Sequence, residues 1–535
     1  MSVIINMVIK MLIINNVKVP LDCTNYKYAI SNKLKINENE ITNFSIIKKA
    51  IDSRNKSDVF FICNFVIEVS NKVKKQVLKH KDIKPYKEYK YEIKKVESNE
   101  KIIIVGTGPA GLFCAYTLAL SGLKPIIIER GEDVENRINS VKKFFNEGQL
   151  NTESNLQYGE GGAGTFSDGK LTTNINDERI EFIKNTFVNF GATEDIKYLS
   201  KPHIGSDILV NVVKNMREEI IKLGGQVFFN TCLTNIITKD NKIEKVEIKR
   251  NNKTELWECD HLILACGHSS KDTIKMLYNN NVNIEQKPFS MGVRIEHLQE
   301  EINKSQYGEK FYKHPALPPA DYKLAVHLEN NRSLYTFCMC PGGMVVASSS
   351  EPETIVTNGM SNYKRDETNA NSALLVNVLT SDYETDHPLA GLYFQEKYEN
   401  LPYSLTNSYK APCSLLKEFL EDKVSTKFGK VKPSYSPGVE FALIKNCLPD
   451  FVSNTIKLGI KEMGKKIRGF DNGDSILTAI ESRSSSPVRI VRNDNFQSNI
   501  LNLYPIGEGS GYSSGITTSA LDGVKCAEVL LKNYK

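Results

Sequence analysis

Residues 101–130 constrain the fold more than any other part of the chain, and they read KIIIVGTGPAGLFCAYTLALSGLKPIIIER. An apolar run, a glycine turn, an apolar helix and a second apolar run predict a strand, helix, strand unit. In such a unit Gly106 permits the tight turn, Gly108 lets the backbone approach a pyrophosphate, and Gly111 lets the helix close on the strand. The second strand ends at Glu129, where a carboxylate would accept hydrogen bonds from an adenosine ribose. This unit predicts a dinucleotide site and leaves both NAD and FAD open.

Three distant segments favour a flavin dinucleotide. Residues 262–268 (LILACGH) have the form of an apolar strand followed by a glycine, as in large flavoproteins where the chain turns under the nucleotide. Residues 503–523 (LYPIGEGSGYSSGITTSALDG) predict a strand, an acidic glycine turn and a helix that begins near Ile516. Residues 159–170 (GEGGAGTFSDGK) supply a second glycine-rich loop.

These motifs occur together with SNLQYGEGGAGTFSDGKLTT, TFCMCPGGMVV and ESRSSSPVRI, and the set closely resembles a bacterial family of uncharacterised FAD-dependent dehydrogenases, sometimes labelled NAD(FAD)-utilising dehydrogenases. The resemblance covers most of the chain, including its N-terminal part. It implies an α/β fold: a Rossmann-like, glutathione-reductase-like FAD-binding domain, interrupted by a mixed α+β substrate or cap domain. A small α+β domain would precede it.

The chain of 535 residues is too long for one ordinary domain, so we expect boundaries where its texture changes. Residues 1–95 would form the N-terminal domain and end in a lysine-rich linker. The FAD-binding domain would begin with 96–285, be interrupted by an inserted domain at 286–490, and be completed by 491–535.

The resemblance implies FAD as the cofactor and assigns most of its contacts. The first glycine loop would surround the pyrophosphate, Arg130 would lie beside the adenine, and the backbone at Leu233 would meet the adenine. Glu508 would lie on the ribityl chain, and the helix that begins near Ile516 would direct free N–H groups at the flavin N1/C2 edge. Such a helix end stabilises the charge of a reduced flavin by roughly 0.5–2 kcal/mol. The expected cofactor-binding residues are Gly106, Thr107, Gly108, Pro109, Ala110, Gly111, Glu129, Arg130, Gly161, Gly162, Thr165, Leu233, Gly267, Gly507, Glu508, Gly515, Ile516 and Thr517.

Two of these segments have simpler interpretations. The sequence GITTSALDG also suits an ordinary helix capped by Ser513 or Ser514. Residues 164–170 (GTFSDGK) match part of a phosphate-binding P-loop, but Leu171 follows where Mg²⁺ needs a hydroxyl ligand, so we set an ATPase aside. Ser167, Asp168 and Lys170 would then reach the flavin or be surface turn residues.

The residues that would bind the substrate have weaker sequence signals than those that would bind the cofactor. Arg294 and Arg483 are the candidates for holding an organic acid, because a guanidinium binds a carboxylate in a bidentate manner, and Arg489 lies nearby in sequence. Ordinary salt bridges, for example from Arg294 to Glu481 or Glu296, are the alternative. Cys338 and Cys340 would share one face of a regular strand, where they would be a redox pair or merely buried small side chains. No motif identifies a catalytic acid or base.

Several features bear on other classes of protein. The 11 scattered cysteines fit neither a disulfide framework nor a zinc site, and the histidines form no ligand cluster, so we expect no metal. Only His268 has a motif that places it near the flavin. The chain shows neither a signal peptide nor an apolar run long enough for a membrane span, so we expect a cytoplasmic protein.

The sequence therefore predicts an FAD-dependent oxidoreductase that moves a hydride or electron pair between FAD and a small organic substrate. No second dinucleotide fingerprint follows residue 130, so NAD(P)H would dock only transiently. Two alternatives stay open. One is flavin-dependent RNA modification served by the lysine-rich residues 71–100, although this segment has no arginine and nucleic acid is the less favoured partner. The other is a protein that binds FAD without turnover.

Overall fold

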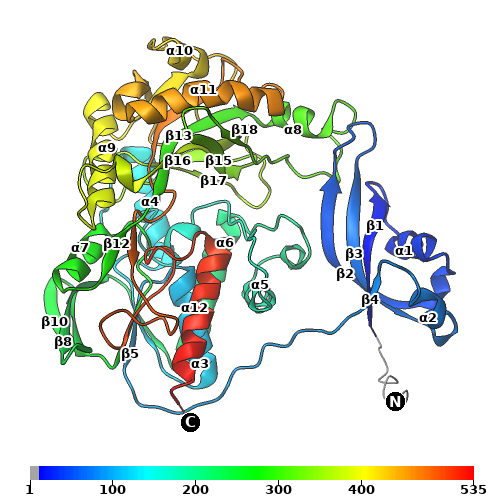
Figure 1. Cartoon of the computed structure of the whole chain (residues 1–535), viewed down its shortest axis with the longest axis horizontal. Coiled ribbons are helices and arrows are strands. Elements are labelled where there is room, and N and C mark those ends of the chain that lie inside the picture. Colours follow the sequence, from blue (N-terminus) through cyan, green and yellow to red (C-terminus); the bar gives the residue numbers. More distant parts are fainter. Residues whose placement is uncertain (1–10, 535) are drawn as a thin grey trace.

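The computed structural model describes residues 11–534, and its N-terminal part is a small α+β unit (Figure 1). An antiparallel sheet with strand order β2-β3-β1-β4 is covered by short helices. Leu12 and Ile14 point into its core, and an irregularity in the pairing before Val17 restores the alternation, so that Val19 is buried too. The elements are β1 (Leu12–Pro20), α1 (Tyr26–Leu34), η1 (Glu38–Glu40), β2 (Ile41–Asp52), β3 (Phe60–Val69), α2 (Asn71–Val77) and β4 (Ile83–Pro85).

A five-stranded parallel sheet forms the centre of the molecule, in the order β23-β11-β5-β6-β7. Its edge strand comes from the C-terminal segment, so distant parts of the chain complete one sheet. The elements are β5 (Ile102–Val105), β6 (Ile126–Ile128), β7 (Gln226–Phe228), β11 (His261–Leu264) and β23 (Leu503–Pro505).

Both faces of this sheet are covered, which explains its continuous apolar strands. Ile102 and Ile104 pack against helices, whereas Ile103 and Val105 pack against an antiparallel sheet of order β10-β9-β8. The covering elements are α3 (Pro109–Ser121), α4 (Val134–Glu147), η2 (Gly162–Gly164), α5 (Arg179–Asn189), η3 (Glu194–Lys197), α6 (Ser206–Lys222), β8 (Thr231–Lys239), β9 (Lys242–Arg250), β10 (Lys253–Glu258), α7 (Lys271–Asn279) and α12 (Ile516–Leu531).

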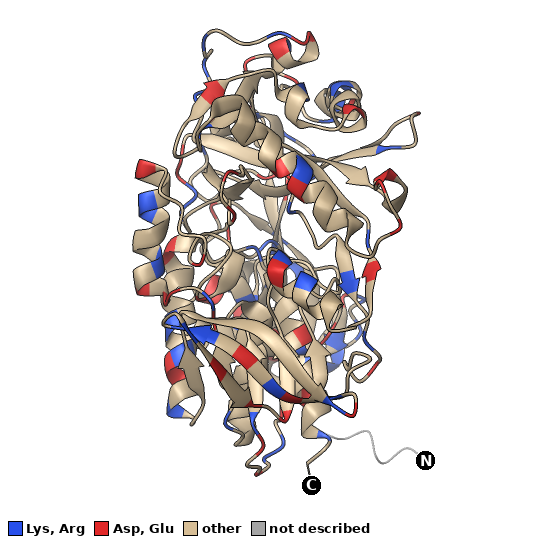
Figure 2. Cartoon of the chain, turned by 90° about the vertical axis from the view of Figure 1, so that its left-hand side faces the viewer, with Lys and Arg blue, Asp and Glu red and all other residues tan. Residues whose placement is uncertain are grey.

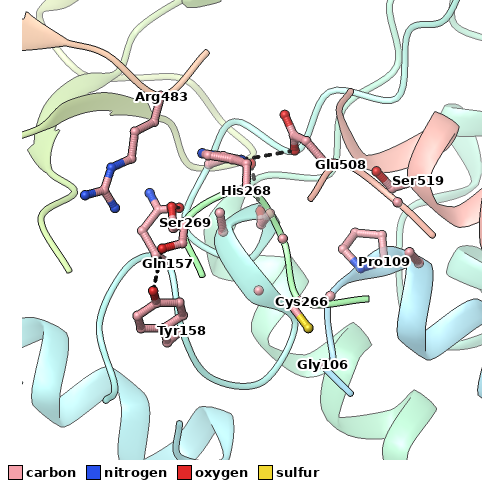
Figure 3. A pocket seen from close by; sticks show the side chains of 18 of the residues that line it. Gly106, Pro109, Gln157, Tyr158, Cys266, His268, Ser269, Arg483, Glu508 and Ser519 are labelled. Atoms are coloured by element: carbon pink, nitrogen blue, oxygen red, sulfur yellow. Dashed lines mark hydrogen bonds and ion pairs between the residues drawn. The ribbon is translucent and has the colours of Figure 1, made fainter. Parts of the chain in front are cut away.

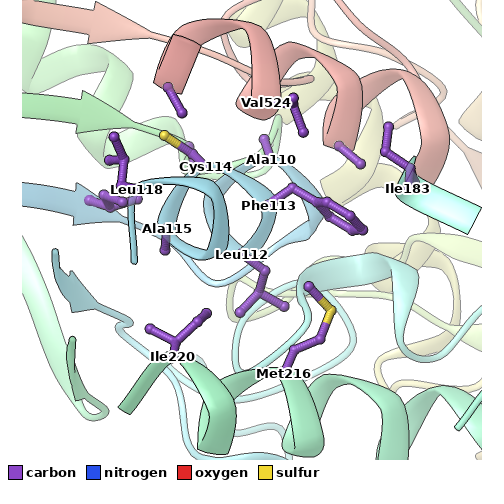
Figure 4. Packing of buried hydrophobic residues seen from close by; sticks show 14 of the residues in the cluster. Ala110, Leu112, Phe113, Cys114, Ala115, Leu118, Ile183, Met216, Ile220 and Val524 are labelled. Carbon is purple, nitrogen blue, oxygen red and sulfur yellow. The ribbon is translucent and has the colours of Figure 1, made fainter. Parts of the chain in front are cut away.

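Helix α3 lies between α12 and α6, as Figure 4 shows. Phe113 and Leu118 are completely buried in this layer. On the α12 side the approach is so close that a Cβ at Gly523 would lie 2.1 Å from the Ala110 carbonyl oxygen. Glycine at 523 is therefore what lets the C-terminal helix pack on the first helix of the domain.

A seven-stranded sheet, in the order β14-β15-β18-β13-β21-β19-β20, fills the region between residues 288 and 482. Its strands are antiparallel to their neighbours except for β19 and β20. The elements of this part are β13 (Phe289–Leu298), α8 (Gln299–Tyr307), β14 (Ala325–His327), β15 (Ser333–Cys340), β16 (Met344–Ala347), β17 (Thr357–Met360), β18 (Asn369–Val378), η4 (Thr380–Asp382), α9 (Ala390–Thr406), β19 (Ala411–Leu415), α10 (Leu416–Leu420), β20 (Val439–Phe441), η5 (Ile444–Cys447), α11 (Asp450–Lys466) and β21 (Ile476–Glu481).

The chain enters and leaves this part through one short antiparallel pair, β12 (Ile284–Gln286) with β22 (Val488–Ile490). Helix α11 covers one face of the large sheet with its buried side chains Val452, Ile456 and Ile460. The predicted fold class is thus confirmed: a Rossmann-like α/β domain interrupted by a mixed α+β part, with a small α+β unit in front.

The lysine-rich linker runs as an extended strap across the parallel-sheet domain (Figure 1). Tyr91 stacks on Phe182 at 4.1 Å between ring centroids, and its hydroxyl donates to Glu528 at 2.8 Å. Val96 is buried in the α3 layer. Tyr91 therefore contacts residues of this chain through both its ring and its hydroxyl group. On the sheet of β8, β9 and β10, basic and acidic residues are interspersed (Figure 2).

None of the helices found between residues 11 and 534 is both long enough and apolar enough to cross a membrane.

We expect Gly523→Val to destabilise the protein, because the new side chain collides with Ala110 and must push α12 away from α3. Overpacking of this kind costs about 1–3 kcal/mol or more. Gly108→Val is the matched control, since a Cβ at Gly108 meets no atom within 4 Å and the φ of −66° suits any residue. Urea unfolding of the cofactor-free protein measures both, and equal midpoints for the two variants would contradict this account of the packing.

Candidate functional site

A long cavity opens at the carboxyl ends of β5, β11 and β23, the edge where open α/β sheets bind ligands. It extends from the first glycine loop to the large antiparallel sheet. Residues from both sheets therefore face the same space. The main lining segments lie within residues 105–110, 157–170, 265–273, 337–340, 358–359, 481–484 and 507–519.

The first glycine loop leaves an open space at the N-terminus of α3. Gly106 has a φ of +103°, and a Cβ there would lie 2.4 Å from the Ala265 carbonyl oxygen, so the turn requires glycine. Gly108 has no atom within 4 Å of its missing Cβ, and a Cβ on Gly162 would approach the Gly108 Cα at 3.1 Å. Pro109 begins the helix at a position whose N–H would have no partner in the helix. Backbone and free helix N–H groups thus border a space suited to a pyrophosphate.

Glu129 is buried beside this loop and holds three backbone segments together. One carboxylate oxygen accepts from the Thr107 N–H at 2.9 Å and the Thr107 hydroxyl at 2.7 Å. The other accepts from the N–H of Gly131 at 3.1 Å and of Gly159 at 2.9 Å. An ionised carboxylate has about four lone-pair positions, so a ribose hydroxyl would have to share an oxygen that is already bonded.

Arg130 and Leu233 border the same end of the cavity. The Arg130 guanidinium lies 4.3 Å from the centre of the Tyr158 ring and makes two 3.0 Å bonds to Asp272. Ion pairs hold this flat group in place, so it can form a wall for a planar ring. Contact with adenine stays a prediction for Arg130 and Leu233.

The C-terminal glycine turn forms the opposite wall. Gly507, Glu508, Gly515 and Ile516 all line the cavity, and helix α12 begins there. Gly515 has a φ of +82°, and no atom lies within 4 Å of its missing Cβ. The N-terminus of α12 therefore points an open backbone edge into the cavity.

His268 stands between the two walls, as Figure 3 shows. Its Nδ1 lies 3.7 Å from a carboxylate oxygen of Glu508. The buried Nε2 has no hydrogen-bond partner anywhere in residues 11–534. A buried polar nitrogen without a partner costs free energy, and among the described residues that line the cavity Nε2 is the one buried side-chain atom left unsatisfied.

A chain of polar side chains supports the loop after β11. The Tyr158 hydroxyl donates to the Ser269 carbonyl at 2.6 Å, and the Ser269 hydroxyl donates to Gln157 at 2.9 Å (Figure 3). Gln157 in turn donates to Ser348, which precedes the hairpin turn between β16 and β17. These bonds tie the wall of the parallel-sheet domain to the inserted part.

Arg483 lines the cavity, but its guanidinium is held by other protein groups. It donates to Glu399 at 2.9 and 2.8 Å, to Ser350 at 2.5 Å and to Glu351 at 2.5 Å. Lys271 joins the same two carboxylates. Burial would raise the pKa of Glu399, but the charges of Arg483 and Lys271 outweigh it and keep that pKa below its ordinary value.

Arg294 lies behind the cavity wall and is completely buried. Its Nε donates to Glu481 at 2.7 Å, and its other nitrogens donate to the Cys338 carbonyl at 2.8 Å and to Asn358 at 3.0 Å. Asn371 is a further acceptor at 3.3 Å. Arg294 therefore supports three residues of the wall, Glu481, Cys338 and Asn358, from behind. Its ion pair with Glu481 is the alternative that the sequence left open.

The second glycine-rich loop brings Ser167, Asp168 and Lys170 to the cavity. Asp168 is buried in a bidentate pair with Arg365, at 2.8 and 2.5 Å. Lys170 is half-buried, and its ammonium makes no hydrogen bond or ion pair with any residue that the structure describes.

Cys338 and Cys340 both line the cavity and lie in strand β15, as expected, but the strand does not alternate simply between them. The pairing of β15 with β18 shifts register between Phe337 and Cys340, and Cys338 has a φ of +42°. A bulge therefore replaces the simple alternation. Cys338 is exposed to the cavity, and desolvation by the surrounding wall raises the pKa of its thiol to about 12, with Arg294 and Lys170 opposing the rise.

The remaining residues predicted to bind the cofactor either line the cavity or belong to the segments that line it. Gly111 packs against Gly106, and Thr165 bonds to the Glu160 carbonyl. Thr517 donates to the Leu171 carbonyl. Those on the lining are Gly106, Gly108, Pro109, Ala110, Glu129, Arg130, Gly162, Leu233, Gly267, Gly507, Glu508, Gly515 and Ile516, and those not on it are Thr107, Gly111, Gly161, Thr165 and Thr517.

Sequence reasoning missed several polar residues of the site. Gln157 and Tyr158 stand in the segment SNLQYGEGG, in which only the glycines carry a recognisable signal. Asn358 and Glu399 have no local signal, because only the folded chain brings them to Arg294 and Arg483. Within residues 11–534, no three His, Cys, Asp or Glu side chains gather as a metal site.

Comparison with known families divides the chain in the same way as the fold. Residues 100–287 match the family described as pyridine nucleotide-disulphide oxidoreductase, and residues 288–484 match the C-terminal domain-like family of FAD-dependent proteins. Residues 11–69 match a domain family of unknown function. With the Rossmann-like fold and the glycine cradle, these matches define an FAD-dependent protein with an oxidoreductase-type fold.

A relative from Clostridium beijerinckii, described as an uncharacterised protein, is 47% identical over 534 residues, which is 97% of this chain and 98% of that protein. The chain belongs to this family of uncharacterised FAD-dependent proteins, as its motifs predict. FAD is its cofactor.

Three solved structures show a general likeness at low identity. The flavin-dependent brominase Bmp2 has a TM-score of 0.37 and 11% identity, covering 81% of this chain and 79% of that one. A geranylgeranyl bacteriochlorophyll reductase-like protein from Thermoplasma acidophilum has a TM-score of 0.35 and 10% identity, with coverages of 83% and 80%. CtdE in complex with FAD has a TM-score of 0.32 and 12% identity, with coverages of 82% and 86%.

We expect Arg294→Met to destabilise the protein by about 3–5 kcal/mol, because it leaves Glu481 buried without its partner. The double variant Arg294→Met/Glu481→Gln should recover part of this loss. Urea unfolding of the four proteins in the cycle measures the coupling. If the single variant were as stable as the wild type, Arg294 would have no structural role in the wall.

Proposed function

We propose that this protein is an FAD-dependent oxidoreductase that transfers a hydride or electron pair between bound FAD and a small organic substrate. The observation that carries the proposal is the shape of the cavity, which joins the glycine cradle to a polar wall from the second sheet. A protein that only stored FAD would need the cradle and not the adjoining space. Bound FAD supplies the two-electron chemistry, and the protein supplies orientation and exclusion of water.

The residues at the cradle would bind the two halves of the cofactor. Gly108 and Gly162 leave room for the pyrophosphate, beside the N-terminus of α3. Glu129 would act mainly by holding the surrounding backbone in place. Arg130 and Tyr158 would cover the adenine end, as the position of their stacked pair supports.

At the other end, the N-terminus of α12 would face the ring system. Its free N–H groups and positive dipole end suit negative charge, so Gly515 and Ile516 would stabilise the reduced cofactor. Glu508 lies beside this helix end and next to His268. It would accept from a ribityl hydroxyl or from His268 Nδ1–H.

His268 would hold or move the proton that accompanies electron transfer. Its Nε2 is buried in the cavity wall without a partner, while Glu508 lies on the Nδ1 side of the ring. A carboxylate at Nδ1 favours the tautomer that has its proton there and an acceptor at Nε2. His268 Nε2 is therefore the group in this cavity best prepared to exchange a proton with a ligand.

Anaerobic mixing tests the proposed function. FAD-loaded protein is mixed with NADH, NADPH and a panel of small organic substrates, and the visible absorbance of the flavin is followed. We expect at least one of these compounds to bleach the flavin in a saturable manner. A flavin that none of them reduces would favour a protein that binds FAD without turnover.

Gly108→Val should abolish FAD retention without unfolding the chain, because its side chain enters the space for the pyrophosphate and its Cβ has no protein atom within 4 Å. The measurement is the flavin absorbance per mole of purified protein, together with the affinity for added FAD. Variant protein with a normal flavin content would contradict the proposed cradle.

His268→Gln should slow flavin reduction by about 10²–10⁴-fold, the usual contribution of a positioned acid or base. Glutamine keeps a polar group near the Nε2 position but exchanges no proton at neutral pH, so we expect FAD content to be unchanged. His327→Gln, at an exposed residue of β14, is the control. An unchanged rate of flavin reduction in His268→Gln would rule out the proposed proton role.

A further inference from the structure

At the substrate end of the cavity, two hydrogen-bond donors have no acceptor among residues 11–534. The two arginines expected to bind a substrate are already engaged, Arg483 by Glu399 and Glu351 and Arg294 by Glu481. The carboxylates on this part of the wall are engaged as well. Neither guanidinium is thus free to recognise a ligand.

Lys170 is the cationic residue of this wall that takes part in none of these ion pairs. It lines the cavity, and its ammonium has no hydrogen bond or ion pair within residues 11–534. The backbone of this loop is held in place by two contacts. Asp168 forms an ion pair with Arg365, and the backbone of Lys170 forms an isolated antiparallel β-bridge with His203. An unpaired ammonium in the wall of a ligand cavity attracts negative charge, so an anionic group of a ligand would be a suitable partner for it.

Asn358 presents a neutral donor on the same wall. Its Oδ1 accepts from Arg294 at 3.0 Å and from the Gly359 N–H at 2.7 Å. These two bonds fix the orientation of the carboxamide, so that its NH₂ group is the free end. This Nδ2 donates to no residue that the structure describes, and Asn358 lines the cavity.

Cys338 connects the two donors. Its carbonyl and the Asn358 side chain accept from the same Arg294 guanidinium, which places the two residues next to each other. Lys170 lines the same cavity as Cys338 and Asn358. Its loop is tied to the chain just after Asn358, because His203, which forms a β-bridge with Lys170, has its Nε2 2.9 Å from the Tyr363 carbonyl oxygen.

We infer that Lys170 and Asn358 form the binding site for a carboxylate group of the substrate, which makes the substrate class a small organic acid. One ammonium and one amide N–H₂ match a singly charged, planar acceptor better than a doubly charged phosphate, for which a second cation would be expected. Arg294 acts as a positioning residue by orienting Asn358. The inference rests on the proposed function, since it assigns the substrate of that same cavity.

Titration of the FAD-loaded protein with acetate, succinate and benzoate tests the inference by calorimetry and by perturbation of the flavin spectrum. Benzamide and inorganic phosphate are the comparison ligands. We expect at least one carboxylate to bind more tightly than both of them. Binding needs no turnover, and the FAD content is measured first, so loss of the cofactor site and loss of the carboxylate site are told apart.

Lys170→Met should weaken carboxylate binding about 10- to 100-fold, the usual effect of losing a charged hydrogen bond, while FAD content and the unfolding midpoint stay unchanged. Lys170→Arg should restore part of the affinity. Asn358→Asp keeps the acceptor for Arg294 but adds a negative charge, so it should also weaken carboxylate binding. Lys201→Met, at an exposed lysine paired with Asp321, is the control.

The inference is wrong if none of the carboxylates binds to the FAD-loaded wild type, or if phosphate or benzamide binds as tightly. It is equally wrong if Lys170→Met binds carboxylates like the wild type. Loss of FAD affinity in Lys170→Met, without a separate effect on carboxylates, would instead assign the ammonium to the cofactor.

Discussion

The packing of α12 on α3 is the contact on which the rest of the site depends. Gly523 allows the C-terminal helix to lie directly on the Ala110 carbonyl, and β23 adds the same segment to the edge of the parallel sheet. Both helices follow parallel strands, so their N-termini open at the same edge. This contact places the turn at Gly515 opposite the glycine loop at Gly108. Without it the cavity would have a binding surface for one half of a dinucleotide and none for the other.

Around this framework, most of the buried charge is neutralised within the protein. Arg483, Lys271 and two glutamates form one closed group, and Arg294 with Glu481 forms another. Such pairs are costly to break and contribute little net stability, but they hold the walls rigid. What they leave without a protein partner around the cavity is a short set of groups: the buried Nε2 of His268, the ammonium of Lys170 and the amide NH₂ of Asn358. A rigid wall with few free polar groups is suited to orienting a small substrate beside a flavin.

The fold class and the cofactor end could be predicted because their signals are local. The turn at Gly106, the approach at Gly108 and the helix that begins with Pro109 depend on residues a few positions apart. The substrate end could not be predicted in this way. The motif around Arg483 says that an arginine is present, whereas its distance from Glu399 depends on the packing of α9. The bulge at Cys338 likewise arises from pairing with β18, which no local pattern encodes.

The sequence alone determined that the chain contains a dinucleotide-binding unit, that a C-terminal glycine turn completes it, and that FAD is the cofactor by family resemblance. The tertiary structure decided which charged side chains are consumed as structural pairs and which remain for a ligand. The physical reason is that a hydrogen bond needs its two atoms within about 3 Å of each other. A sequence motif can identify the donor, but folding decides which acceptor lies within that distance. Arg294 and Lys170 are both basic residues in glycine-containing segments, but Arg294 is buried with Glu481 and other acceptors around its guanidinium, whereas Lys170 lines the cavity without a protein partner among the described residues.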